Sequence, residues 1–358
     1  MKLLYITNGI TGSGGLERVM SVKASLLAND FGYEVHILRL NESHKDRFFS
    51  FSEKLTFHSV AVSGNPLHYF LKYKKGIQKI VHELKPDIIS VCDDGLKGFL
   101  LPFIIQTKAK WIHESHASLQ LSNVGSGLSF LKKIQHSLKQ FLGKRFSNIV
   151  LLTEGNKKEW STKNLVIIPN PLPFQTSSVS ALHSKKIIAV GSFSFNKGYD
   201  LLLQIWRDVA LDFAEWELNI YGSRTHENLT LIATHLNLTN IYFHDPVGNI
   251  VEKYLGSSIM VLPSRSEGFG MVLIEAMNCG LPVISFDCPN GPKDIITEGE
   301  DGFLVENGDM ERFAEKLRTL MESEGLRQKM GATARANSLK YHPNEIVREW
   351  DQLFKNLM

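Results

Sequence analysis

Two glutamates, Glu267 and Glu275, stand eight positions apart on either side of a glycine-rich turn. An apolar run at 258–263 predicts a buried strand before the turn, and a helix-forming run follows it. Such a turn gathers backbone N–H groups at the positive end of a helix, which suits a phosphate. One carboxylate on the loop and one inside the helix are suited to the hydroxyl groups of a nucleotide sugar. The turn residues expected to contact its phosphates are Gly268, Phe269, Gly270 and Met271.

A second segment places a lysine and a glycine at the start of an expected helix. Lys197 and Gly198 follow the expected strand 186–192 and precede the expected helix 199–209. A lysine in this position can act as a mobile point charge on a diphosphate. The alternative is that Lys197 is only a solvated residue at the beginning of a helix.

A glycine-rich loop at 12–15 joins the first expected strand to the first expected helix. Glycine lets the backbone approach a ligand closely, and its N–H groups can face a phosphate. Gly14 and Gly15 are therefore candidate substrate-binding residues. A loop of this kind also opens dinucleotide-binding domains, so an NAD-dependent dehydrogenase stays open as an alternative.

His113, Glu114 and His116 lie at or just beyond the end of the expected strand 109–113. Ligands bind at the strand ends of doubly wound sheets, so both histidines are candidate site residues. Either one could instead be a half-buried, hydrogen-bonded histidine. Two histidines and a glutamate could also begin a metal site, but the sequence shows no evident further ligand, and we expect no metal.

Taken in order, these segments resemble the retaining, two-domain glycosyltransferases of family 4, which have the GT-B fold. The string 263–277 resembles the family's EX7E segment, 14–19 resembles its GGxER loop, and 189–202 resembles its lysine-glycine loop. The resemblance implies two Rossmann-like, doubly wound α/β domains that face each other across a cleft holding the donor.

The resemblance also implies roles for individual residues. Glu275 would bind the ribose, Lys197 would stabilise the diphosphate, and Glu267 and His116 would orient the sugar. The anomeric configuration would be retained, and the donor phosphate would accept the proton of the acceptor. No metal or other cofactor is implied.

One position departs from the family pattern. Ser192 stands where the family has an arginine before the lysine-glycine pair, so one cation of the diphosphate site is missing. Arg224 and Arg265 are candidates to replace it, and otherwise donor binding would be weaker. This departure supports a further alternative, a catalytically weak sugar-nucleotide-binding partner protein.

The elements that must position these residues alternate between strands and helices along both halves of the chain, which predicts parallel, doubly wound sheets. We expect an acceptor-binding domain at 1–170 and a nucleotide-sugar-binding domain at 171–340, joined by a proline- and serine-rich linker at 166–184. The last helix, about 341–358, is expected to pack back on the first domain. Further strands are expected at 3–7, 34–40, 55–62, 87–92, 147–152, 216–222, 241–243, 282–286 and 302–305.

Charge is distributed unevenly between the two halves. Residues 1–170 contain 23 Lys and Arg against 13 Asp and Glu, whereas the whole chain carries only +3. A basic first half suggests an anionic partner: a membrane surface or a phosphate-bearing acceptor, and not nucleic acid, for which no motif is present. Two basic, amphipathic stretches, 66–85 and 127–148, either bury their apolar stripes in the core or lie on anionic lipid.

Three cysteines without metal-ligand spacing, and the absence of an apolar run of transmembrane length, fit a reduced, cytosolic protein. A peripheral location at the inner face of a membrane is also compatible with these features. The function implied by the resemblance is transfer of a hexosyl or N-acetylhexosaminyl group from a nucleotide sugar, preferably a UDP-sugar. The acceptor would be a glycan or a lipid-linked glycan in the synthesis of surface polysaccharide or lipopolysaccharide.

Overall fold

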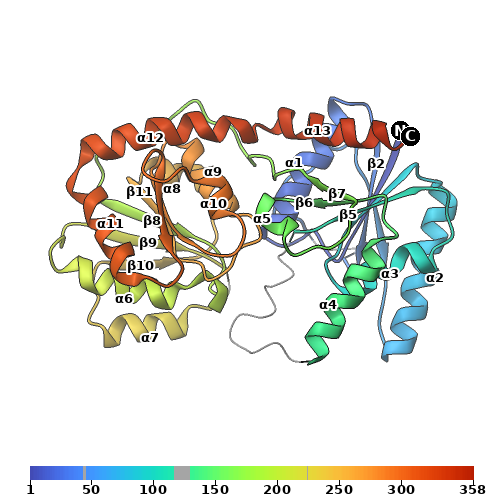
Figure 1. The fold of residues 1–358 in the computed structure, drawn as a ribbon, viewed down its shortest axis with the longest axis horizontal. Helices are drawn as coiled ribbons and strands as arrows, with labels where there is room; N and C mark the ends of the chain where they lie inside the picture. The colour runs from blue at the N-terminus through green and yellow to red at the C-terminus, as the bar shows by residue number, and fades with distance from the viewer. Residues whose placement is uncertain (43–45, 117–129, 224) are drawn as a thin grey trace. The chain divides into compact units, whose positions relative to one another are not determined.

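The computed structural model describes residues 1–42, 46–116, 130–223 and 225–358. The chain forms two compact units (Figure 1). Unit 1 comprises Met1–Pro173 together with Pro343–Met358, and unit 2 comprises Phe174–His342. Each unit contains one parallel sheet with its own helices. None of the helices in the described ranges combines the length and apolarity needed to cross a bilayer.

The sheet of unit 1 has seven strands in the order β3-β2-β1-β4-β5-β6-β7, and every pairing is parallel. Its strands are β1 (Lys2–Thr7), β2 (Glu34–Leu40), β3 (Thr56–Val60), β4 (Ile88–Cys92), β5 (Lys110–Glu114), β6 (Asn148–Leu151) and β7 (Leu165–Ile167). Its helices are α1 (Gly15–Asn29), α2 (Pro66–Leu84), α3 (Leu96–Ile104), α4 (Phe130–Gly143), α5 (Glu154–Lys157) and α13 (Pro343–Asn356). The linker expected from residue 166 onward was placed too early, because 165–167 form the edge strand β7.

The sheet of unit 2 has six strands in the order β10-β9-β8-β11-β12-β13, again all parallel. Its strands are β8 (Lys186–Val190), β9 (Glu217–Tyr221), β10 (Ile241–His244), β11 (Ile259–Leu262), β12 (Val283–Asp287) and β13 (Gly302–Glu306). Its α-helices are α6 (Tyr199–Ala210), α7 (Glu227–His235), α8 (Ile250–Leu255), α9 (Met271–Asn278), α10 (Pro292–Ile295), α11 (Met310–Glu322) and α12 (Glu324–Ser338). The doubly wound, parallel α/β architecture expected from the sequence is confirmed in both units.

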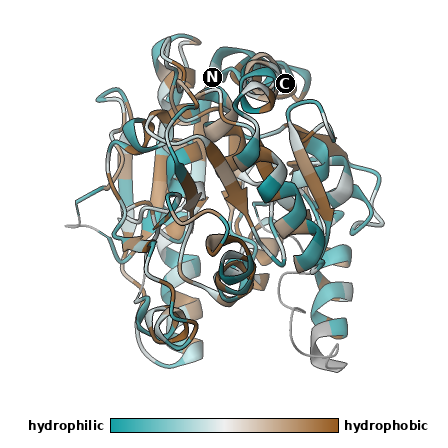
Figure 2. Ribbon diagram, turned by 90° about the vertical axis from the view of Figure 1, so that its left-hand side faces the viewer, coloured by the Kyte–Doolittle hydropathy of each residue, from teal (hydrophilic) through white to brown (hydrophobic). Residues whose placement is uncertain are grey.

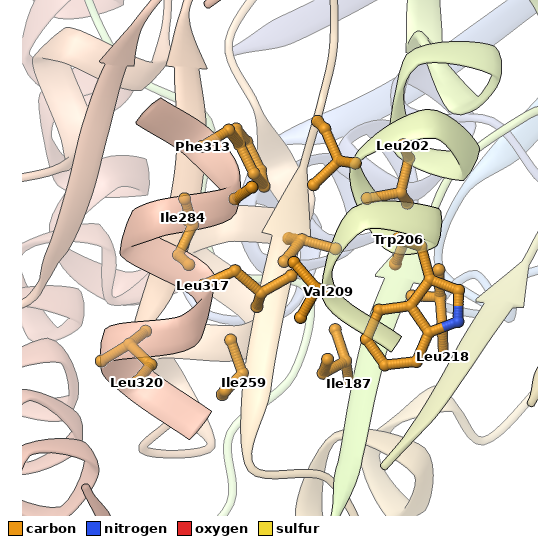
Figure 3. Close-up of a cluster of buried hydrophobic side chains, with 14 of the residues drawn as sticks. Ile187, Leu202, Trp206, Val209, Leu218, Ile259, Ile284, Phe313, Leu317 and Leu320 are labelled. Carbon is orange, nitrogen blue, oxygen red and sulfur yellow. The ribbon is translucent and has the colours of Figure 1, made fainter. Parts of the chain in front are cut away.

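The sheets are apolar because helices cover both of their faces. Figure 2 shows the strands as mainly hydrophobic and the helices as mixed. In unit 2, side chains of α6 and α11 pack against alternate residues of the central strands (Figure 3). The side chains of this cluster include Ile187, Leu202, Trp206, Val209, Leu218, Ile259, Ile284, Phe313, Leu317 and Leu320.

The helix that ends the chain completes the core of unit 1. Val347, Trp350 and Phe354 of α13 are buried in one cluster with Met20 and Ala24 of α1. These two helices lie against each other (Figure 1). The first sheet is therefore covered on this face by helices from opposite ends of the sequence.

The two basic, amphipathic stretches differ in the structure. In α2, Tyr73 and Ile77 are buried while the lysines face solvent, which is the ordinary core arrangement. In α4, by contrast, Ile134, Leu138 and Phe141 are 48%, 39% and 63% exposed. The apolar stripe of α4 is thus left largely uncovered.

Candidate functional site

The candidate donor site of unit 2 lies at the carboxyl ends of its central strands. The order of the sheet reverses between β8 and β11, and ligands bind outside the carboxyl ends of strands at such a switch point. The loops that follow these strands and β12 carry the residues singled out from the sequence. They are the lysine-glycine loop (191–198), the EX7E loop (263–270) and the loop 287–291.

Two glycines allow these loops to touch. Gly198 has a φ of +67°, and a Cβ atom there would lie 2.0 Å from the carbonyl oxygen of Pro263. Gly291 has a φ of +99°, and its Cβ atom would lie 2.0 Å from the carbonyl oxygen of Phe269. A side chain at either position would push its loop away from the EX7E loop, so glycine is required at both.

Lys197 and Glu267, both expected in the site, meet directly. The Lys197 ammonium donates to Glu267 Oε1 at 2.6 Å, and the Ser264 hydroxyl donates to the same oxygen at 2.6 Å. The side chain of Lys197 is 21% exposed and that of Glu267 is 9% exposed. A partly buried ammonium group is therefore held by fixed partners at the rim of the loop.

The EX7E loop ends at Gly270, which has a φ of +101° and caps α9. The first N–H groups of α9 have no acceptor inside the helix, so they are free of helical pairing next to Met271. Glu275 lies one turn inside the helix, is only 1% exposed, and accepts a hydrogen bond from the hydroxyl of Tyr254 at 3.1 Å. The two glutamates of the motif thus differ in position, as expected from their spacing.

Arg265 has a partner within the protein. Its guanidinium forms two hydrogen bonds with the carboxylate of Asp200, both at 2.7 Å, and a third with the carbonyl oxygen of Phe195 at 2.8 Å. Binding of a diphosphate by Arg265 would therefore have to compete with or share this pair, and its role as the missing cation stays a prediction. Ser192 contacts the hydroxyl of Ser194 at 3.2 Å, and Arg224 lies outside the described residues.

In unit 1, a buried glutamate stabilises the start of the glycine-rich loop through hydrogen bonds. Glu42 is 8% exposed and accepts hydrogen bonds from the backbone N–H of Ile10 and the hydroxyl of Thr11, at 2.8 and 2.6 Å. Beyond these contacts, Gly14, which caps α1, and Gly15, its first residue, are both exposed. Glu42 is therefore occupied in shaping this loop, whereas a dehydrogenase would use an acid at this strand end for a ribose.

The two candidate histidines lie at the end of β5 in one polar network. His116 Nε2 lies 3.2 Å from Glu114 Oε2, and the His116 backbone N–H donates to Asp94 at 3.2 Å. His113 Nε2 lies 3.3 Å from the other carboxylate oxygen of Asp94. His113 is fully buried, whereas the side chain of His116 is 12% exposed. Of the two, only His116 reaches the surface.

Glu114 is the centre of this network and was not expected to carry a buried ion pair. Its carboxylate pairs with the ammonium of Lys23 and accepts from the hydroxyl of Ser90 at 2.6 Å. Burial alone would raise the pKa of Glu114, but the neighbouring Lys23 and His116 lower it to about 2. The carboxylate is therefore ionised at neutral pH.

A possible metal-ligand cluster in the described part of the chain comprises Cys92, Glu114 and His116, whose ligand atoms lie within 4.8 Å of one another. The sequence did not reveal Cys92 as a neighbour because it lies on the adjacent strand β4. The ammonium of Lys23 already occupies the cationic position beside Glu114. A metal ion would have to displace this buried ammonium, so the residues do not fit a metal well.

Comparisons with known proteins agree with this arrangement. The family model for glycosyl transferases group 1 matches residues 175–337, and that for glycosyl transferase 4-like proteins matches residues 17–93. An uncharacterized glycosyltransferase of Haemophilus influenzae is 31% identical, with 98% of each chain covered. The amylovoran biosynthesis glycosyltransferase AmsD of Erwinia amylovora is 30% identical, covering 98% of this chain and 99% of the relative.

Two solved structures share the fold over the whole chain. The lipopolysaccharide outer core galactosyltransferase WaaB superposes with a TM-score of 0.77 at 18% identity and full coverage of both chains. Anabaena HepE, solved with UDP-glucose, gives a TM-score of 0.77 at 15% identity, covering 99% of this chain and 100% of HepE. At these identities, the likeness shows the fold alone.

Two doubly wound parallel sheets, one with a lysine and glycine loops at its switch point, define an α/β protein of GT-B fold. The sequence relatives narrow this class: the chain belongs to the group 1 glycosyltransferases, also known as family 4. It is related to enzymes of polysaccharide biosynthesis.

Proposed function

We propose that this protein is a retaining glycosyltransferase that moves a hexosyl or N-acetylhexosaminyl group from a UDP-sugar to a glycan or lipid-linked acceptor. The observation that carries the proposal is the convergence of Lys197, Glu267 and the start of α9 at the switch point of unit 2. A cation and a set of backbone N–H groups there can stabilise a departing nucleoside diphosphate. Relatives named for polysaccharide biosynthesis support a surface glycan as product.

In the proposed reaction, the bond between the anomeric carbon and the diphosphate oxygen breaks, and a bond to an acceptor hydroxyl forms on the same face. The acceptor proton passes to the departing diphosphate, so no separate base is required. Lys197 and the N–H groups of residues 269–271 stabilise the growing negative charge.

Glu267, held by Ser264, orients the sugar, and Glu275 binds the ribose. In unit 1, Gly14 and Gly15 bind substrate, and His116 helps to orient the sugar.

Uracil is the proposed base because HepE, which shares the fold, was solved with UDP-glucose. A thermal-shift screen with UDP, GDP, ADP and NAD in the presence of a chelator tests the choice. A ligand that binds only the folded protein raises the melting temperature by mass action. A selective shift with UDP is expected, and a shift with another nucleoside diphosphate in its place would correct the base.

Turnover is tested separately by incubating the protein with UDP-glucose or UDP-N-acetylglucosamine and a lipid-linked glycan acceptor. We expect release of UDP and an acceptor extended with the anomeric configuration of the donor, read by proton NMR. Binding of UDP without transfer or hydrolysis from any UDP-hexose would favour the alternative of a catalytically weak partner protein, which Ser192 suggests.

We also propose that α4 brings the enzyme to an anionic bilayer at the inner face of the membrane. Ile134, Leu138 and Phe141 form an uncovered apolar stripe, while Lys133 and Lys144 nearby are exposed. An apolar face flanked by cations fits the interface of an anionic membrane, and binding there should weaken with salt. Such a surface would place the site near lipid-linked acceptors.

Sedimentation with vesicles tests this surface. We expect binding to phosphatidylglycerol vesicles at low salt, little binding to phosphatidylcholine, and loss of binding when Leu138 and Phe141 are both changed to Ser. Leu231→Ser is a matched control, because Leu231 is equally exposed on α7 of unit 2. Absence of binding to anionic vesicles at low salt would remove the proposal.

A further inference from the structure

The strongest unexplained feature of unit 1 is a fully buried lysine. Lys23 lies on the inner face of α1, 0% exposed, between the apolar residues Met20 and Leu27. Its ammonium lies 3.9 Å from the centre of the Trp350 ring and 5.0 Å from that of Tyr5. An apolar residue would serve the core at this position better, because removing an ammonium from water is costly.

The cost is offset by the buried ion pair with Glu114, which is 1% exposed. A buried ion pair need not stabilise the fold, because well-packed apolar residues of the same volume often stabilise a protein as much or more. Breaking only one partner, however, leaves a buried charge. The pair is therefore better explained by what the Glu114 carboxylate does on its other side.

That other side faces His116. Glu114 Oε2 contacts both the Lys23 ammonium and His116 Nε2, while Ser90 donates to Oε1. An ionised carboxylate can only accept hydrogen bonds, so His116 Nε2 must carry the proton of this contact. The His116 Nδ1 atom is then the ring nitrogen left for other partners.

We propose that Lys23, Glu114 and Ser90 are positioning residues that fix the orientation and tautomer of His116. The proposal rests on the proposed role of His116 in orienting the donor sugar. Lys23 keeps Glu114 charged, Ser90 fixes the plane of the carboxylate, and the carboxylate holds the imidazole ring. The backbone hydrogen bond from His116 to Asp94 fixes the chain at the same point.

Two variants separate the positioning of His116 from the packing of the core around Lys23 and Glu114. Glu114→Gln keeps the shape but can donate to His116, and we expect kcat to fall about 10–100-fold, as for lost outer partners of functional histidines. The double variant Lys23→Met/Glu114→Leu replaces the pair by apolar residues. We expect it to keep its melting temperature while kcat falls by the same factor, and wild-type kcat in this variant would overturn the proposal.

A double-mutant cycle links the effect to the histidine. In a His116→Ala background, Glu114→Gln should cause no further loss, because the two residues act as one unit. Full additivity of the two losses would contradict the proposal. Lys157→Ala is a matched control, because Lys157 forms an exposed ion pair with Glu154 in the same unit.

Nitrogen-15 NMR of histidine-labelled protein gives a readout that does not depend on turnover. The ring of His116, assigned through His116→Asn, should show the Nε2–H tautomer in the wild type and lose this preference in Glu114→Gln. An unchanged tautomer would overturn the proposal even if transfer activity is established. Conversely, failure to detect any glycosyl transfer would count against the proposed function and leave this test intact.

Discussion

At the scale of single residues, the protein holds the Lys197 ammonium in place before any charge develops on a substrate. Its ammonium is held by Glu267 at 2.6 Å, and its aliphatic stem lies beside Gly191, where a Cβ atom would be 3.2 Å from the lysine Cε. A glycine at 191 therefore leaves room for the lysine stem. In the proposed reaction, fixed partners of this kind would lower the reorganisation needed when the diphosphate departs.

Replacing Lys197 with Ala should lower kcat about 100–1,000-fold and change the Kd for the intact UDP-sugar less, because in the proposed reaction its charge is needed most as the leaving group forms. Steady-state kinetics and calorimetric titration with the UDP-sugar in the absence of acceptor measure the two effects. Lys293→Ala is the control, since Lys293 is 77% exposed in the same unit. Equal losses in binding and turnover would indicate a ground-state role instead.

Replacing Glu275 with Ala should weaken nucleotide binding more than it lowers kcat. If the carboxylate binds the ribose, the Kd for UDP should rise about tenfold or more, as expected for a lost charged hydrogen bond. UDP lacking its ribose hydroxyls should bind the wild type and the variant equally. A wild-type Kd for UDP in Glu275→Ala would refute the assignment.

The sequence predicted candidate site residues that belong to local patterns, but it did not predict contacts between segments that are distant in the chain. Glu267 and Glu275 became candidates because one loop and the helix after it contain both. Lys23 and Glu114 are 91 positions apart, and Glu42 meets the glycine-rich loop only through the pairing of β1 with β2. Such pairings follow from tertiary packing, which neither spacing nor residue type reveals.

At the scale of elements, the candidate site consists of loops that are joined by specific side-chain contacts. The Arg265 guanidinium joins the EX7E loop to Asp200 in the first turn of α6, and it stacks 4.0 Å from the centre of the Phe195 ring. Burial alone would raise the pKa of Asp200, but the hydrogen bonds from Arg265 lower it. The lysine-glycine loop and the EX7E loop are therefore fixed relative to each other.

Arg265→Lys should loosen this junction while keeping the charge, because lysine cannot form the two parallel hydrogen bonds. We expect a loss of about 1–2 kcal/mol in the free energy of unfolding and a fall of about tenfold in kcat from misplacement of Lys197. Arg312→Lys is the control, since its pair with Glu315 is exposed. Unaltered kcat would show that the two loops hold their positions without the arginine.

Most of the strands were predicted from the sequence, and so was the helix at 199–209. Their observed bounds agree with the expected ranges within a few residues. Helix α8 was missed because six residues give too little periodicity. Helix α3 contains Pro102, which argues against a helix in the sequence, and β7 was hidden by the prolines that follow it.

At the scale of the whole molecule, each unit has its own sheet and core, but the chain enters unit 1 twice. Trp350 of α13 is 3% exposed and lies beside Met20 and Ala24 of α1. Removing its ring would open a cavity in unit 1 alone. The resemblance of the sequence to two-domain enzymes anticipated this return of the last helix, which composition and periodicity do not reveal.

Trp350→Ala should therefore destabilise unit 1 by about 3–5 kcal/mol and leave unit 2 unaffected. Hydrogen exchange measured by mass spectrometry should show faster exchange in α1 and β1 but not in β8 or β11. Trp206→Ala, in the core of unit 2, should give the converse pattern. Faster exchange in both sheets of Trp350→Ala would contradict independent cores.

The return of the chain at residue 343 also sets an order of events on the ribosome. Unit 2 is continuous from Phe174 to His342, so all of its strands emerge before α13 is made. The second unit can therefore finish folding first, while α1 still exposes Met20 and Ala24. A chain that stops before α13 is synthesised leaves this apolar face open to chaperones and proteases, so unit 1 becomes protected only after Pro343–Asn356 has emerged.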